Sequence, residues 1–184
     1  LEWSDEGVQG SFRFLNRVMK LVEGDFEAGP SQMSNKDKNL ISKQHKTIKI
    51  VTGHIENFEF SLAIGRLMEF VNAIYKYREG EINKKAYDDA VKTAALLLSP
   101  FAPHASEEIW EMLGMKGLIS LERWPEYDEK KIDEAAEAAE ELISNTLSDI
   151  KQVMDLVKIK SPKKITLIVS KAWKYDYVKV LKEQ

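Results

Sequence analysis

The 184-residue sequence contains no cysteine. The protein therefore has no disulfide bonds, no thiol nucleophile and no thiolate metal ligand. This absence fits a reducing compartment, so we expect a cytoplasmic protein. The sequence also lacks an apolar run long enough to span a membrane and shows no signal-peptide pattern, so we expect no membrane partner.

Motifs of nucleotide-binding and hydrolytic sites are missing as well. There is no G-x-x-x-x-G-K-[ST] loop, and neither a Ser/His/Asp arrangement nor a carboxylate pair stands out. In the stretch HASEE, Glu107 and Glu108 follow His104 by three and four residues and share a helix face with it. A zinc site needs three or four ligands, which this stretch does not supply. We therefore predict a structural joint here, with no catalytic residue, metal or cofactor in the chain.

What the sequence does contain is an asymmetric distribution of charge around a net charge of -3. Residues 122–141, called the acidic segment below, hold nine acidic and three basic residues. Residues 151–184 hold nine lysines and three acidic residues. Such an asymmetry can mark an end of the chain that binds anions. The acidic segment alternatively suggests a surface that binds a partner protein.

Apolar periodicity predicts five helices with short connections in the first 116 residues. Ser4 is the predicted N-cap of the first, and the second begins near Ser34. The third covers about 58–77, the fourth about 84–98, and the fifth begins near Pro103. This pattern predicts a mainly α protein built on an antiparallel helical bundle over residues 1–116.

The expected core residues are apolar and recur every three or four positions along these helices. They are Val8, Phe12, Leu15, Met19 and Val22, then Leu40, Ile41, Ile48, Val51 and Ile55, then Phe60, Ile64, Leu67, Val71 and Ile74, then Tyr87, Ala90, Val91, Ala94, Leu97 and Leu98, and finally Ile109, Trp110 and Leu113.

The remaining residues predict a different organisation. Residues 117–131 read as an irregular linker, and residues 132–184 as a long helix followed by the start of an α/β module. The long helix is expected to break at Pro162, and the β-branched residues 165–169 predict a strand before a last helix near Ala172. A single strand forms no sheet, so we expect this α/β appendix to be incomplete.

Two groups of lysines are candidates for contacts with phosphate groups, which require only positive charge at a reachable spacing. The first group lies on the second predicted helix, opposite its apolar face, and comprises Lys36, Lys43, Lys46 and Lys49. The second group flanks the break and the strand, and comprises Lys158, Lys160, Lys163, Lys164, Lys171 and Lys174. The alternative for both groups is an ordinary solvated surface.

Three stretches and a Trp-Pro pair occur in an order that resembles the leucyl-tRNA synthetases, which are class I aminoacyl-tRNA synthetases. They are LEWSDEGVQGSFRFLNRVMKLV, FEFSLAIGRLMEFVNAIYKY, LLLSPFAPHASEEIWEMLG and Trp124-Pro125. The third stretch is shared with the valyl and isoleucyl enzymes, whereas the first is more specific to the leucyl enzyme. The stretch KIKSPKKITLIVSKAWK resembles the archaeal and eukaryal branch of that family.

The resemblance implies a part of the enzyme that follows its catalytic domain. The whole enzyme would attach leucine to its tRNA with ATP and Mg bound in the catalytic domain, which this chain lacks. The family's bundle packs along the tRNA body, leucyl enzymes generally do not read the anticodon, and a C-terminal module takes part in tRNA recognition. The implied partners are leucine tRNA and the rest of the synthetase chain, in a monomer, and Arg13 and Arg17 become further candidates for tRNA contacts.

Other observations limit this resemblance. The chain has no HIGH motif, and QMSNK at residues 32–36 resembles the KMSKS loop without its leading lysine, with Asn35 where that motif has lysine. We predict that it is a turn leading into the second helix. The sequence does not begin with methionine, so we expect a piece of a longer protein. A valyl or isoleucyl enzyme and a helical protein-interaction module stay open as alternatives.

Overall fold

The computed structural model describes residues 5–23, 33–79 and 81–171. The chain divides into two compact units, Leu1–Leu142 and Ile143–Gln184, and each is described by itself. The division falls inside the last described helix, because the first turns of that helix contact the helices that precede it. The predicted domain boundaries at residues 116 and 132 stay predictions.

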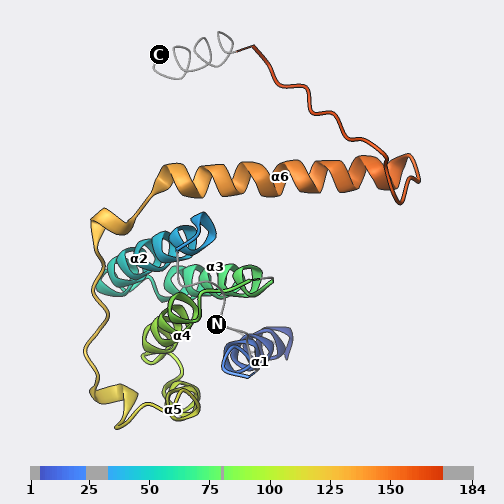
Figure 1. Cartoon of the computed structure of the whole chain (residues 1–184). Helices are drawn as coiled ribbons and strands as arrows, with labels where there is room; N and C mark the ends of the chain where they lie inside the picture. Colours follow the sequence, from blue (N-terminus) through green and yellow to red (C-terminus); the bar gives the residue numbers. More distant parts are fainter. Residues whose placement is uncertain (1–4, 24–32, 80, 172–184) are drawn as a thin grey trace. The chain divides into compact units, whose positions relative to one another are not determined.

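The first unit is a helical bundle, as predicted (Figure 1). Its helices are α1 (Asp5–Met19), α2 (Asn35–Glu56), α3 (Phe60–Arg78), α4 (Lys84–Leu98) and α5 (Pro103–Met112). Helix α2 packs against both α3 and α4, and α5 packs against α4 and α1. Two single-turn 3-10 helices follow, η1 (Ile119–Leu121) and η2 (Glu129–Lys131), before the long helix α6 (Glu134–Leu156) begins.

Local chemistry explains where the central helices begin. The hydroxyl of Ser34 accepts from the backbone N–H of Asp37, and the Asp37 carboxylate accepts from the N–H of Ser34, which is a capping box at the start of α2. The predicted turn into this helix is thus confirmed from Met33 onward. Asn83 caps α4, and Pro103 occupies the first turn of α5. Gln32 and Ser4, the predicted cap of α1, lie outside the described residues.

The core confirms some predicted faces and corrects others. All six residues predicted to be buried on α4 are buried. On α1 the prediction is right only in part: Leu15, Met19 and Val22 are partly buried against the core, but Val8 and Phe12 are exposed. The most deeply buried residues, Phe14, Val18 and Leu21, each lie one position before a predicted one, which is about 100° of helix rotation. On α3, Leu67, Val71 and Ile74 are buried, but Phe60 is 47% exposed.

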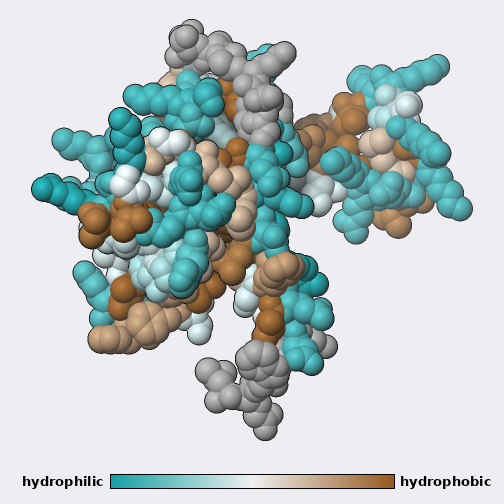
Figure 2. Space-filling view, turned by 90° about the horizontal axis from the view of Figure 1, so that it is seen from below, coloured by the Kyte–Doolittle hydropathy of each residue, from teal (hydrophilic) through white to brown (hydrophobic). Residues whose placement is uncertain are grey.

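Apolar groups outside the core are spread over the surface. Figure 2 shows one face of the molecule, on which hydrophilic side chains surround several smaller apolar patches. None of the described helices is both long and apolar enough to cross a membrane.

In the second unit, α6 continues to Leu156 and is followed by a segment without regular structure up to Lys171. The helix ends six residues before Pro162, and Lys158 turns the chain with a positive φ of 56°. Residues 165–169, the predicted strand, have no regular structure in the described part of the chain, where no neighbouring strand is present to pair with them. A β-branched run supplies propensity, but strand structure requires a hydrogen-bonded neighbour. The helix predicted near Ala172 falls outside the described residues.

Candidate nucleic-acid interface

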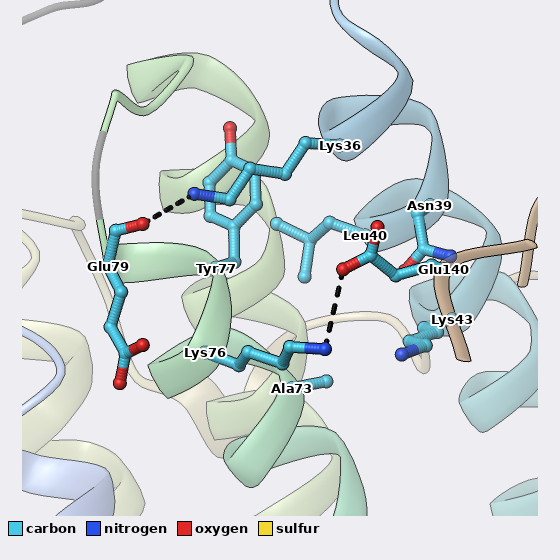
Figure 3. A pocket seen from close by; sticks show the side chains of 9 residues that line it. All are labelled: Lys36, Asn39, Leu40, Lys43, Ala73, Lys76, Tyr77, Glu79 and Glu140. Carbon is cyan, nitrogen blue, oxygen red and sulfur yellow. Dashed lines mark hydrogen bonds and ion pairs between the residues drawn. The ribbon is translucent and has the colours of Figure 1, made fainter. Parts of the chain in front are cut away.

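The lysines predicted on the second helix lie together with cations of α3. Lys36 and Lys43 of α2 and Lys76 of α3 line a pocket of about 210 Å³ (Figure 3). Lys43 and Lys46 line a second pocket of about 290 Å³ with Arg66 of α3. We call this surface the α2–α3 face. Sequence reasoning missed Arg66 and Lys76, although positions 66, 69, 73 and 76 follow the spacing of one helix face and line these pockets.

The acidic segment supplies carboxylate partners for two lysines of this face and for Lys49 of α2, which lines neither pocket. Lys46 Nζ lies 2.9 Å from Glu137 Oε2, Lys49 Nζ lies 2.6 Å from Glu129 Oε1, and Lys76 Nζ lies 3.3 Å from Glu140 Oε1. The hydrogen bond from Lys49 to Glu129 raises the pKa of the lysine. The α2–α3 face is therefore largely neutralised from within the same unit.

Hydrogen bonds around Ser42 of α2 fix the acidic segment on this face. The Ser42 hydroxyl donates to Glu137 Oε1 over 2.7 Å and accepts from the backbone N–H of Asp133 over 2.7 Å. The side-chain amide of Asn39 donates to the carbonyl of Ala136 over 3.3 Å. Because Ser42 is fully buried, these contacts hold the start of α6 directly against α2.

The remaining predicted site residues of the bundle have mixed environments. Lys36 donates to the carbonyl of Glu79 over 2.8 Å and lies over the ring of Tyr77, so it joins α2 to the end of α3. Arg17 donates to Asn72 Oδ1 over 2.7 Å, so it joins α1 to α3. Of the predicted site residues in the bundle, Lys43 and Arg13 have no hydrogen-bond or ion-pair partner among the residues that the structure describes. Arg13 is exposed, whereas Lys43 is half-buried.

The predicted lysines of the tail belong to the second unit. Lys158, Lys160, Lys163, Lys164 and Lys171 are all exposed, and Lys174 lies outside the described residues. Their side chains are accessible to solvent, which a phosphate contact requires. Their role as tRNA contacts stays a prediction.

The joint between α4 and α5 has the structural role that the sequence predicts. Ile109 and Trp110 are buried, and His104 is exposed. The Glu107 carboxylate accepts the backbone N–H groups of Ile119 and Ser120 over 2.8 and 3.2 Å, so it caps η1. Desolvation raises the pKa of Glu107, but these hydrogen bonds outweigh it and hold the pKa below its ordinary value.

Residues 37–169 match the family model of the anticodon-binding domain of tRNA ligase. The chain belongs to this family. No cluster of three or more histidine, aspartate and glutamate side chains suited to a metal ion occurs in the described ranges of this anticodon-binding domain.

Curated relatives of this anticodon-binding domain are leucine–tRNA ligases. The enzyme of Caldanaerobacter subterraneus subsp. tengcongensis is 44% identical in an alignment of 140 residues that covers 71% of this chain and 17% of the relative. The enzyme of Prochlorococcus marinus is 40% identical in an alignment of 137 residues that covers 73% of this chain and 16% of the relative. The enzyme of Fusobacterium nucleatum subsp. nucleatum is 40% identical in an alignment of 145 residues that covers 72% of this chain and 17% of the relative. The chain thus spans about a sixth of the length of these relatives.

A solved structure gives the same assignment. The fold resembles part of the crystal structure titled as the ternary complex of Agrobacterium radiobacter K84 agnB2 LeuRS, tRNA and LeuAMS. The TM-score is 0.62 at 27% identity, and the match covers 72% of this chain and 18% of that chain. The resemblance to leucyl-tRNA synthetases found in the sequence is confirmed. The resemblance of residues 158–174 to the archaeal and eukaryal branch stays a prediction.

Proposed function

We propose that this chain is the tRNA-docking, C-terminal part of a leucyl-tRNA ligase, the enzyme that attaches leucine to its tRNA with ATP. The observation that carries this proposal is the 40–44% identity to three leucine–tRNA ligases over more than 70% of the chain. The chain contributes no catalytic group to this proposal, and ATP and Mg belong to the catalytic domain. The further partners proposed are the rest of the synthetase chain and leucine tRNA, in a cytoplasmic monomer.

The rival functions have less support. The named relatives are leucine enzymes, so nothing favours a valyl or isoleucyl enzyme over a leucyl one. For a protein-interaction module, the acidic segment would have to offer its carboxylates to a partner. Glu129, Glu137 and Glu140 instead pair with lysines of the same unit. The acidic segment is therefore a poor candidate for an independent docking surface.

Two measurements on the purified chain test the proposed function. The first is binding to a leucine tRNA transcript by fluorescence anisotropy between 50 and 200 mM salt, chosen because phosphate contacts make binding strongly salt-dependent across about this range. We expect salt-sensitive binding with little preference over a non-cognate tRNA, because phosphate contacts carry no sequence information. The second is leucine-dependent ATP–pyrophosphate exchange, which we expect to stay at the level of a blank without protein. Exchange well above the blank, or no tRNA binding at the lowest salt, would contradict the proposal.

A further inference from the structure

An open groove of about 770 Å³ lies between α2 and α4 and is closed on one side by η2. Four lysines line it, namely Lys84, Lys85 and Lys92 of α4 and Lys131 of η2. Among the lining residues that the structure describes, Asp89 carries the only carboxylate. We call this surface the α2–α4 groove, and its lining has an excess of positive charge.

The lysines of the α2–α4 groove are largely available for an anion. Lys85 and Lys131 are exposed and form no ion pair with any residue in the described ranges. Lys84 pairs with Asp88 over 3.4 Å within one turn of α4, and both side chains are about half exposed. Lys92 lies 5.2 Å from the centre of the Trp110 ring and forms no ion pair with a carboxylate in the part of the chain that the structure describes. The exposed ion pair of Lys84 and Asp88 contributes little to stability, so a phosphate can compete with Asp88 for Lys84.

The α2–α3 face differs from this groove in its partners. There, Lys46 and Lys76 each have a carboxylate of the acidic segment within 3.3 Å, and Arg66 pairs with Glu69 over 2.7 Å. A phosphate backbone could approach this face only by displacing these carboxylates, which carry the same sign of charge as the phosphate. The two surfaces therefore have similar numbers of lysines but different net charge.

The pKa of buried His45, which lines the α2–α4 groove, is affected by the positive charge of Lys131. Its Nδ1 accepts from the backbone N–H of Asp128 over 3.1 Å. Burial lowers the pKa of His45 first, and the charge of Lys131 lowers it further. An imidazole that remains neutral adds no charge of its own, so the charge of the groove lining comes from its four lysines and Asp89.

We propose that the α2–α4 groove binds the phosphodiester backbone of tRNA, and that the α2–α3 face does not while the acidic segment covers it. This inference rests on the proposed function, because it identifies which surface of the bundle contacts the tRNA. It also relocates the bundle contacts that the sequence predicted on the second helix, which were Lys36, Lys43, Lys46 and Lys49, and it leaves the predicted contacts of the tail lysines as they were.

Two variants that each lose three positive charges test this assignment. The groove variant is Lys84→Gln, Lys85→Gln and Lys131→Gln, and the matched control is Lys43→Gln, Lys46→Gln and Lys49→Gln. Equal loss of charge cancels the long-range effect of net charge, so the difference between the variants reports the location of the contacts. Affinity for a leucine tRNA transcript is measured against salt for both variants and the wild type, with urea unfolding as a check of folding.

We expect the groove variant to bind more weakly and to lose about 0.7–0.9 from the slope of log affinity against log salt for each phosphate contact removed. The control should keep a slope close to that of the wild type. If the control loses at least as much slope as the groove variant, the assignment to the groove is overturned although tRNA binding stands. If the wild-type chain binds no tRNA at all, the proposed function fails and the groove assignment fails with it.

Discussion

The hydroxyl of Tyr77 donates to the carboxylate of Asp37, which joins the last turn of α3 to the first turn of α2. The same hydroxyl accepts the backbone N–H of Asn83, the cap of α4, over 2.7 Å. Burial raises the pKa of Tyr77, and the hydrogen bond to Asp37 raises it further, so the phenol stays protonated and able to donate. One buried hydroxyl therefore connects three helices.

We predict that Tyr77→Phe lowers the free energy of unfolding by about 1–3 kcal/mol, because it leaves buried hydrogen-bonding groups without a partner. Urea unfolding followed by circular dichroism measures this change. Tyr127→Phe is the control, since Tyr127 is 42% exposed and should change stability by less than about 0.5 kcal/mol. Equal effects of the two substitutions would contradict the role assigned to Tyr77.

The joint between α4 and α5 gives a second prediction. Trp110 is 1% exposed, so Trp110→Ala should cost about 3–5 kcal/mol of stability. His104 is exposed, so His104→Ala should change stability by less than about 0.5 kcal/mol. Comparable shifts of the urea midpoint at unchanged slope would show that His104 is not ordinary surface.

A third prediction concerns pH. The pKa of His45 lies below its ordinary value of 6.5, so the unfolded chain binds more protons than the folded chain between the two values. This contribution to stability is present above pH 6.5 and is lost as the pH falls toward the folded-state pKa. NMR titration of the ring should give a pKa below 6.5.

Substitution of Lys131 tests how much of the lowered pKa of His45 comes from the charge of this lysine. Lys131→Gln should raise the pKa of His45, because it removes a positive charge that disfavours the protonated ring. The value should stay below 6.5, since burial remains the larger cause. Lys130→Gln removes the same charge one residue away and should change the pKa less. A larger change with Lys130→Gln would contradict the placement of Lys131 beside His45.

The acidic segment gives a fourth prediction. Glu129→Gln, Glu137→Gln and Glu140→Gln together should strengthen tRNA binding, because they uncover Lys46, Lys49 and Lys76. Each newly available lysine that reaches a phosphate should add about 0.7–0.9 to the salt slope. The control variant, Glu122→Gln, Glu126→Gln and Glu141→Gln, removes the same charge from exposed residues of the same segment. An equal gain in the control would show that net charge alone explains the effect.

The sequence predicted α4 more accurately than α1, and the reason lies in their residues. Asn83 and the alanine- and leucine-rich pattern that follows it permit one start and one buried face. On α1 the apolar residues extend around more than one face, so the pattern of Val8 and Phe12 was as regular as that of Phe14 and Val18. Only packing against the other helices selects between these faces.

The candidate site could be predicted only in part, because its contacts join distant residues. The lysines of α2 are visible in the sequence as a polar stripe, but Lys46 and its partner Glu137 are 91 residues apart. No local pattern indicates that the acidic segment neutralises this stripe. Lys131 joins Lys84 and Lys85 in the α2–α4 groove for the same reason, since the fold brings η2 beside α2.

The way the acidic segment is held also has a consequence for motion within the native state. None of residues 122–141, all of which the structure describes, is fully buried, and apart from Trp124, which packs against the core, mainly polar contacts hold this segment. A region with few buried apolar contacts opens at a lower free energy than the core helices, and its amide protons exchange sooner with solvent. Each such opening releases the partners of Lys46, Lys49 and Lys76 together. The amount of unpaired positive charge on the α2–α3 face therefore depends on how often the acidic segment detaches. This fraction varies with temperature and salt while the core of the bundle remains folded.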